Sequence, residues 1–163
     1  MHARGGITVG RVDNRKRPRE FLASCRRVEF PTGLSLRGAS WRHRLDLDPA
    51  PDFVLALLGR PPMGAPWPCR WVRWPDFGLP ASTDAAVLAV REVVERGREE
   101  RVAVLCGSGV GRTGSALALV AALTGVPVEE AIGWVRRHYH PRAVETPWQR
   151  RWVVATASEL SGP

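Results

Sequence analysis

The spacing of apolar residues predicts strands in the first two thirds of the chain and mainly helices in the last third. Alternation over residues 25–36, interrupted by the turn residues 31–33, predicts a β-hairpin. The apolar run at 52–58 fits either a buried strand or a short helix, because periodicity does not separate the two at this length. Residues 70–74 and 102–105 predict two more strands, and most of 38–65 carries no clear pattern.

Apolar positions with helical spacing predict four helices. The first covers 85–98 and follows the good N-cap residues Ser82, Thr83 and Asp84. The other three are expected at 112–123, 128–138 and 147–160. Because this first helix joins two strands, it predicts a right-handed parallel crossover, which places the carboxyl ends of both strands at one edge of the sheet.

The predicted helix 147–160 has a recognisable start. Thr146 is placed as N-cap, Pro147 as the first helical residue and Gln149 as the third, which is the pattern of a capping box. Packing on the core is the simplest role for the large side chains that follow, which are Trp148, Trp152 and Val153. We likewise expect Trp71 to pack in the sheet and Trp74 to act as a hinge for the loop after it.

A glycine-rich stretch follows the strand at 102–105. Cys106 begins it, glycines with small spacers continue it, and Arg112 and Thr113 end it at the start of a helix. Unpaired backbone N–H groups in such a turn bind anions, and they favour the thiolate form of a cysteine held among them. Arginine contacts two phosphate oxygens at once. The stretch therefore predicts an enzyme in which sulfur attacks phosphorus.

Other interpretations of the same stretch are weaker. A Walker A loop needs one more residue between its glycines, and a lysine where Arg112 stands. Residues 109–114 match the dinucleotide pattern G-x-G-x-x-G, but the chain continues into a second helix instead of a strand that ends in an acid. A purely structural buried cysteine leaves the arginine and the clustered glycines unexplained.

Two motifs resemble those of the cysteine-dependent protein tyrosine and dual-specificity phosphatases. The run Cys106-Gly-Ser-Gly-Val-Gly-Arg112-Thr113 is similar to their C-x5-R-[ST] loop, and Trp74-Pro75-Asp76 is similar to their mobile W-P-D loop. The resemblance covers residues 70–153. It implies a small α/β domain of the dual-specificity type, with a central, mostly parallel sheet flanked by helices.

The resemblance also implies a role for each motif residue. Cys106 is the nucleophile that forms a phosphocysteine, and Asp76 is the general acid and then the base. Thr113 is the residue whose hydroxyl stabilises the sulfur as a leaving group. The phosphate is held by the Arg112 side chain and by the backbone N–H groups of Gly107, Ser108, Gly109, Val110, Gly111 and Arg112. No metal or other cofactor is expected, because these groups supply the positive field.

The sequence departs from the family pattern at two places. Leu105 stands where a histidine usually precedes the cysteine, so the thiolate depends on the loop itself. In the glutamine-bearing segment that places the hydrolytic water, Gln149 matches the second glutamine and Glu145 replaces the first. Gln149 therefore has two alternative roles, orienting water or capping its helix.

Composition adds context to these motifs. The chain has 163 residues and a net charge of +8, and Lys16 is its only lysine. The basic segment 1–22 is expected to be a flexible arm, and 23–163 a single domain. The positive field favours anionic substrates, but no motif supports specific binding of nucleic acid.

Cellular context follows from cysteines and hydropathy. The spacing of Cys25, Cys69 and Cys106 fits neither a metal site nor a disulfide framework, which favours a reducing compartment. Cys25 and Cys69 are expected to be core cysteines, with a protective disulfide to Cys106 as the alternative. No segment is predicted to span a membrane or to act as a secretory signal, so a cytoplasmic location is expected.

The predicted substrate is a phosphorylated protein or a small phosphomonoester, with phosphate, sulfate or vanadate as simple anions for the loop. A protein tyrosine or dual-specificity phosphatase fits best, because the loop spacers Ser108 and Val110 replace the lysines of phosphoinositide phosphatases. Two alternatives remain open. One is a phosphatase of a metabolite or nucleotide, and the other is a non-catalytic protein that only binds phosphate.

Overall fold

A single five-stranded sheet forms the centre of the protein in a computed structural model that describes residues 25–162. The arm expected at 1–22 lies outside the described residues. In spatial order the strands are β1 (Cys25–Glu29), β2 (Ser35–Ser40), β5 (Val102–Cys106), β3 (Phe53–Leu58) and β4 (Cys69–Arg73). β1 and β2 form the predicted antiparallel hairpin, and all other neighbours are parallel. The expected mostly parallel sheet is confirmed.

Local sequence signals locate the helices well. The helices are the 3-10 helix η1 (Trp41–Asp46), α2 (Thr83–Arg96), α3 (Gly111–Leu123), α4 (Val128–His138) and α5 (Pro147–Leu160). Ser82 caps α2 by accepting a hydrogen bond from the Ala85 N–H, and the capping box between Thr146 and Gln149 is present at α5. The ambiguous run at 52–58 forms the strand β3, because it lies between two other parallel strands and its residues from Phe53 to Leu57 are buried.

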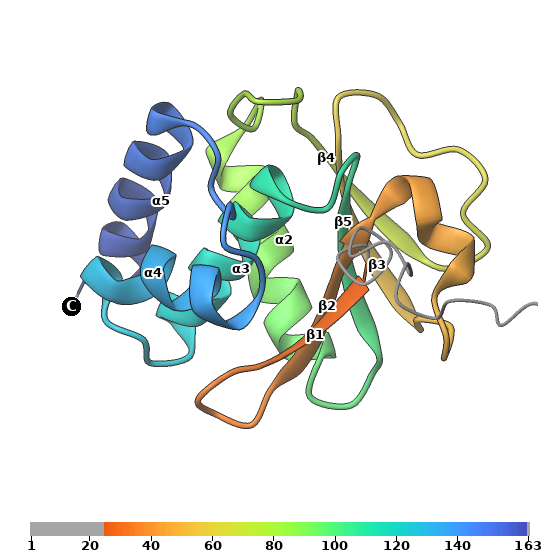
Figure 1. The fold of residues 1–163 in the computed structure, drawn as a ribbon, viewed down its shortest axis with the longest axis horizontal. Helices are drawn as coiled ribbons and strands as arrows, with labels where there is room; N and C mark the ends of the chain where they lie inside the picture. The colour runs from red at the N-terminus through yellow and green to blue at the C-terminus, as the bar shows by residue number, and fades with distance from the viewer. Residues whose placement is uncertain (1–24, 163) are drawn as a thin grey trace, which may run out of the picture.

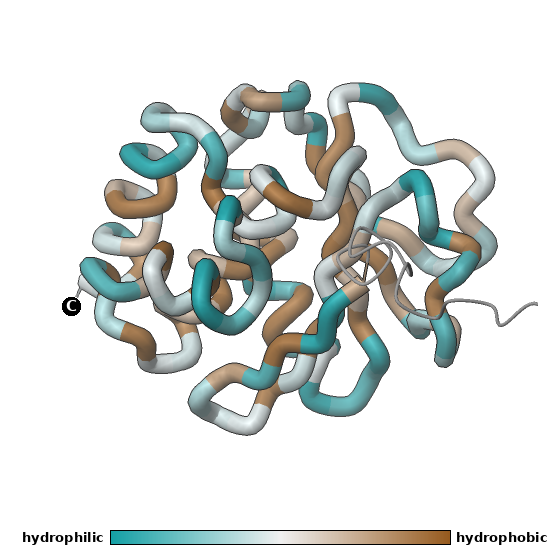
Figure 2. The backbone as a smooth tube through the Cα atoms, in the orientation of Figure 1, coloured by the Kyte–Doolittle hydropathy of each residue, from teal (hydrophilic) through white to brown (hydrophobic). Residues whose placement is uncertain are grey.

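The two faces of the sheet are covered differently (Figure 1). Helices α2 to α5 lie on one side, while η1 and the β3–β4 connection lie on the other. The larger hydrophobic core fills the space between the sheet and the helices. A smaller apolar cluster on the opposite face contains Ala39, Leu47, Val54, Ala103 and Leu105. Figure 2 shows hydrophobic residues concentrated along the inner strands and α3.

Helix α3 occupies the middle of the helical layer. It contacts α2, α4, α5 and β5, and every residue from Gly111 to Ala121 is buried. A helix with such surroundings is apolar on all sides, which explains the uninterrupted small and apolar residues after Thr113. The helix is therefore a fixed support for the loop that precedes it.

Two predictions for tryptophans were wrong. Trp71 lies on the edge strand β4, is 37% exposed and donates its indole N–H to the Leu58 carbonyl. Trp148 is also half exposed, whereas Val153 is buried and Trp152 packs edge-on against Trp74. Trp74 itself is fully buried, so it anchors its loop in the core. Within residues 25–162, no helix is long and apolar enough to cross a lipid bilayer.

Candidate active site

The carboxyl ends of four parallel strands lie at one edge of the sheet and bring the predicted motifs together there. Ser40 at the end of β2 pairs with Cys106 at the end of β5. On the other side of β5, Leu57 of β3 pairs with Cys106, and β4 then leads directly into Trp74. Since all these strands run the same way, residues distant in the sequence meet here.

The phosphate loop, which we define as residues 106–112, joins β5 to α3. Cys106 is buried at its base, and α3 starts without a side chain that caps its first N–H groups. Within the described residues, Ser108, Gly109 and Val110 donate no backbone hydrogen bond. A helix start with unpaired N–H groups attracts an anion. The loop therefore has the donors that a phosphate group requires.

Two glycines of the phosphate loop fit where a side chain would collide. Gly109 has φ of +76°, and a Cβ there would lie 2.6 Å from the Ala39 carbonyl carbon. A Cβ on Gly111 would lie 2.5 Å from the Glu145 carboxylate. Gly109 needs glycine for its backbone conformation and because the backbone of β2 leaves no space, whereas at Gly111 the close atoms belong to the exposed side chain of Glu145, which can move. The loop is thus shaped by close contacts with β2 and with the segment before α5.

Three hydroxyl groups satisfy the carbonyls of alternate residues in the phosphate loop. Ser40 Oγ donates to the Gly107 carbonyl at 2.6 Å, and Ser115 Oγ donates to the Gly111 carbonyl at 2.8 Å. The Tyr139 hydroxyl donates to the Gly109 carbonyl between them. Buried carbonyls need such partners. With these carbonyls bound from outside, the N–H groups of the loop remain available to an anion.

Tyr139 reaches the phosphate loop because β2 carries a glycine beneath its ring. A Cβ on Gly38 would lie 2.4 Å from a ring carbon of Tyr139. Burial, followed by the charge of nearby Cys106, raises the pKa of Tyr139 far above its ordinary value. Its hydroxyl therefore keeps its proton and acts as a donor.

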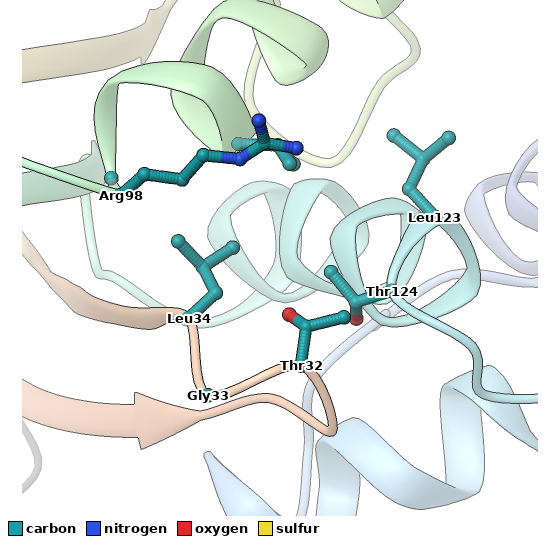
Figure 3. Close-up of a pocket in the computed structure, with 8 residues that line it drawn as sticks. Thr32, Gly33, Leu34, Arg98, Leu123 and Thr124 are labelled. Atoms are coloured by element: carbon teal, nitrogen blue, oxygen red, sulfur yellow. The ribbon is translucent and has the colours of Figure 1, made fainter.

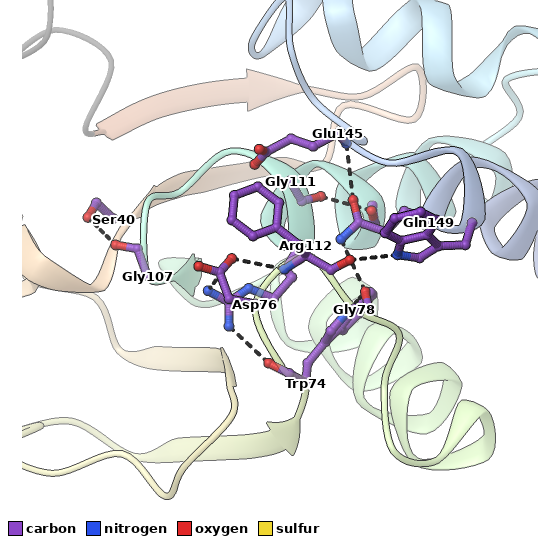
Figure 4. A network of polar contacts seen from close by, with 12 residues as sticks. Ser40, Trp74, Asp76, Gly78, Gly107, Gly111, Arg112, Glu145 and Gln149 are labelled. Atoms are coloured by element: carbon purple, nitrogen blue, oxygen red, sulfur yellow. Dashed lines mark hydrogen bonds and ion pairs between the residues drawn. The ribbon is translucent and has the colours of Figure 1, made fainter.

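Arg112 connects the phosphate loop to the acid loop, which we define as residues 74–80. Its side chain is 5% exposed, and Nη1 donates to the Trp74 carbonyl at 2.9 Å. Nη2 lies 3.3 Å from Oδ1 of Asp76, whose side chain is 61% exposed (Figure 4). The structure thus brings Asp76 to Arg112, at the end of the loop that begins with Cys106, as the sequence predicts.

The acid loop is attached to the first turn of α5. The indole N–H of Trp148 donates to the Phe77 carbonyl at 2.6 Å, and Gln149 Nε2 donates to the Gly78 carbonyl at 3.1 Å. Gln149 Oε1 meanwhile accepts from the N–H groups of Glu145 and Thr146. Both hydrogen bonds of the capping box are present, so the capping role of Gln149 is confirmed. The Gln149 side chain is only 1% exposed. Its role in orienting water stays a prediction.

Thr113 is fully buried, and within the described residues its hydroxyl has no hydrogen-bond partner. A buried hydroxyl without a partner is costly. Its position one residue after Arg112, at the start of α3, agrees with a role beside the sulfur, and that role stays a prediction.

Leu105, Cys25 and Cys69 lie in surroundings that differ from the polar phosphate loop. Leu105 points into the small apolar cluster on the far face of the sheet, where an apolar residue fits. Cys25 is exposed and Cys69 is half-buried, so the expectation that both are core cysteines was wrong for Cys25. All three cysteines are free, and burial raises the pKa of the Cys69 thiol.

Sequence reasoning missed Ser40, Tyr139 and the contact made by Trp148. Each acts through a carbonyl of a segment far away in the chain, and Ser40 and Tyr139 belong to no local motif. The only available signal for Ser40 was its place at the end of a strand that runs parallel to β5.

A separate cavity of about 290 Å³ lies at the other end of α3 (Figure 3). Its lining includes Thr32, Leu34, Arg98 and Thr124, which come from the hairpin turn and the ends of α2 and α3. Since α3 separates this cavity from the phosphate loop by its whole length, the cavity is not part of the site.

Comparison with known proteins agrees with the geometry. A family model described as protein-tyrosine phosphatase matches residues 66–156. The curated relatives include two uncharacterized proteins of Methanocaldococcus jannaschii, MJECL20 and MJ0215. MJECL20 is 39% identical over 89 residues, which are 53% of this chain and 58% of that protein. MJ0215 is 34% identical over 87 residues, which are 53% and 54%. The chain thus spans between half and two thirds of these relatives.

Solved structures show the same fold. The crystal structure of Tk-PTP in the active form superposes with a TM-score of 0.62 at 24% identity, covering 77% of this chain and 90% of that one. The protein tyrosine phosphatase TbPTP1 of Trypanosoma brucei has a TM-score of 0.61 at 12% identity, covering 86% and 75%.

Proposed function

Because the chain belongs to the protein-tyrosine phosphatase family, we propose that it hydrolyses phosphate monoesters with Cys106 as nucleophile and Asp76 as general acid. The observation that carries this proposal is the ion pair between Arg112 and Asp76 at the mouth of the phosphate loop. It puts an acid next to the group that would hold the phosphate, above a buried thiol.

In the first step, the phosphate loop and Arg112 would neutralise the three non-bridging oxygens of the substrate. The Cys106 thiolate attacks phosphorus, the bond to the ester oxygen breaks, and phosphocysteine forms. Asp76 gives its proton to the departing oxygen. The exposure of the Asp76 side chain supports this role, because the acid must reach a leaving group on the solvent side.

In the second step, water attacks the phosphocysteine and the sulfur leaves as thiolate. Asp76, now ionised, accepts a proton from that water. Thr113 is proposed to donate a hydrogen bond to the departing sulfur, which would give its buried hydroxyl a partner. We also propose a water-orienting role for Gln149, which would require its amide to leave the Gly78 carbonyl.

A protein phosphotyrosine or dual-specificity substrate is proposed, and a small metabolite or nucleotide is the second candidate. Exposed Phe77 and Trp148, next to Asp76, favour a substrate with an aromatic or apolar part. We also propose that residues 23–163 form one catalytic domain. A reducing compartment such as the cytoplasm is proposed because the nucleophile must stay a thiol.

Turnover of 4-nitrophenyl phosphate in the presence of EDTA tests this function. The wild-type protein should be active, and Cys106→Ser should lose all measurable turnover while it still binds vanadate or phosphate. Cys25→Ser is the matched control, since it makes the same change at an exposed cysteine outside the site. Full activity of Cys106→Ser would exclude the mechanism, and a wild-type protein that binds vanadate without turnover would indicate a phosphate-binding protein only.

A further inference from the structure

The acid loop is held by side chains from distant segments at several points. Trp148 and Gln149 of α5 bind the carbonyls of Phe77 and Gly78. The Gly78 carbonyl also accepts the indole N–H of Trp74 at 2.8 Å. On the opposite side, Arg112 contacts Trp74 and Asp76. The Asp76 carboxylate contacts Arg112 and accepts the Phe77 N–H, but it is mostly exposed, so the contacts to its neighbours in the loop also place it.

The backbone of the acid loop is strained at the residue that Trp148 holds. Phe77 has φ of +56°, in the left-handed region that a bulky residue seldom occupies. Such a conformation persists only where surrounding contacts fix it. Inside the loop, the Gly78 N–H donates to the Pro75 carbonyl and the Phe77 N–H donates to Asp76 Oδ1, both at 3.0 Å. Trp148 adds the contact from outside the loop, to the Phe77 carbonyl. Without the bond from Trp148, only the contacts inside the loop would hold Phe77 and, with it, Asp76, the residue before it.

We propose that Trp148 is a positioning residue for the general acid: its indole N–H holds Phe77 in the left-handed conformation and thereby keeps Asp76 beside Arg112. The inference rests on the proposed function. Trp148 contacts neither the phosphate loop nor Cys106 through any hydrogen bond in the described residues. It should therefore affect protonation of the leaving group while leaving phosphate binding unchanged.

The variant Trp148→Phe separates this role from others, because it removes the N–H group and keeps an aromatic ring. Trp134→Phe is the matched control. It makes the same change in α4, where the ring stacks on Phe30 and His138, away from the acid loop.

The decisive measurement is kcat/KM for a series of aryl phosphates whose leaving groups differ in basicity. Acid catalysis matters most for basic leaving groups. We expect Trp148→Phe to lose about tenfold on phenyl phosphate, the factor that one hydrogen bond can supply, and much less on 4-nitrophenyl phosphate. Inhibition by vanadate should not change. Trp134→Phe should show the wild-type dependence on leaving group.

Hydrogen exchange of the peptide covering 74–80 gives a readout that does not depend on activity. Its amides should exchange faster in Trp148→Phe than in the wild type, while the amides of α3 keep their rates. An unchanged leaving-group dependence with unchanged exchange would overturn the proposal. An equal loss on every substrate would also overturn it and would indicate that the ring binds substrate. Failure of the proposed function itself would instead appear as an inactive wild-type protein.

Discussion

The phosphate loop and the acid loop meet at Arg112, but they are stabilised in different ways. The phosphate loop lies between a central strand and a fully buried helix, and its carbonyls bind hydroxyl groups from β2, α3 and the end of α4. The acid loop extends from the edge strand β4, and its Asp76 carboxylate is mostly exposed. One part of the site belongs to the core, and the other is attached to the surface of α5.

This difference separates two requirements of phosphate ester hydrolysis. Anion binding needs many donors fixed in one arrangement, which a packed core provides. Leaving-group protonation needs an acid that substrates and water can reach, which an exposed loop provides. Substitutions in the phosphate loop should therefore change anion binding, and substitutions in the acid loop should change the rate with basic leaving groups.

The largest effect is expected from Asp76→Asn, which removes the transferable proton and keeps the size of the side chain. General acid catalysis contributes about 10²- to 10⁴-fold, so kcat/KM for phenyl phosphate should fall by that order. The loss should be smaller for 4-nitrophenyl phosphate. Because the phosphate loop is intact, vanadate should inhibit the variant as well as the wild type. Weaker vanadate binding of the same order would contradict the separation of the loops.

An intermediate effect is expected from Tyr139→Phe, which removes one hydroxyl from a buried position. The Gly109 carbonyl then loses its partner, which costs about 1–3 kcal/mol in stability or in the conformation of the loop. Chemical denaturation and phosphate inhibition should both show the loss. Ser40→Ala, which frees the Gly107 carbonyl, should change both quantities in the same direction. Normal phosphate affinity in both variants would mean that the hydroxyls do not shape the loop.

The smallest effect is expected from Thr146→Ala, which removes the N-cap of α5. Loss of a cap costs about 1 kcal/mol of unfolding free energy. Ser82→Ala removes the corresponding cap of α2 and serves as control. Both variants should lose similar stability in thermal denaturation. Only Thr146→Ala should also lower turnover of phenyl phosphate by a few-fold, because α5 holds the acid loop. Equal kinetics in the two variants would argue against that connection.

Sequence alone predicted the parts of the structure that local patterns determine. The helices α3, α4 and α5 were located within one residue at each end, since caps and apolar spacing define them. The meeting of Asp76, Cys106 and Arg112 followed from motifs and from the direction of parallel strands. The predicted burial of Trp71 and Trp148 was wrong, because hydrophobicity does not say which side of an edge strand or helix faces solvent.

Other parts could not be predicted because they depend on tertiary contacts. The hydroxyls of Ser40 and Tyr139 act on the phosphate loop from segments 67 and 30 residues away. The clearance that Gly38 provides for the Tyr139 ring becomes visible only when β2 and the end of α4 are placed together. Contacts of this kind leave no periodic or local signal in the sequence.

The burial of α3 has a consequence for how ligand binding and folding are linked. The phosphate loop continues directly into this helix, and the helix touches most other elements of the fold. We therefore expect large changes in the shape of the loop to be coupled to the packing of α3 and thus to unfolding of the domain. By mass action, an anion in the loop then stabilises the whole domain against unfolding. Anion binding to the loop and unfolding of the domain are therefore thermodynamically linked.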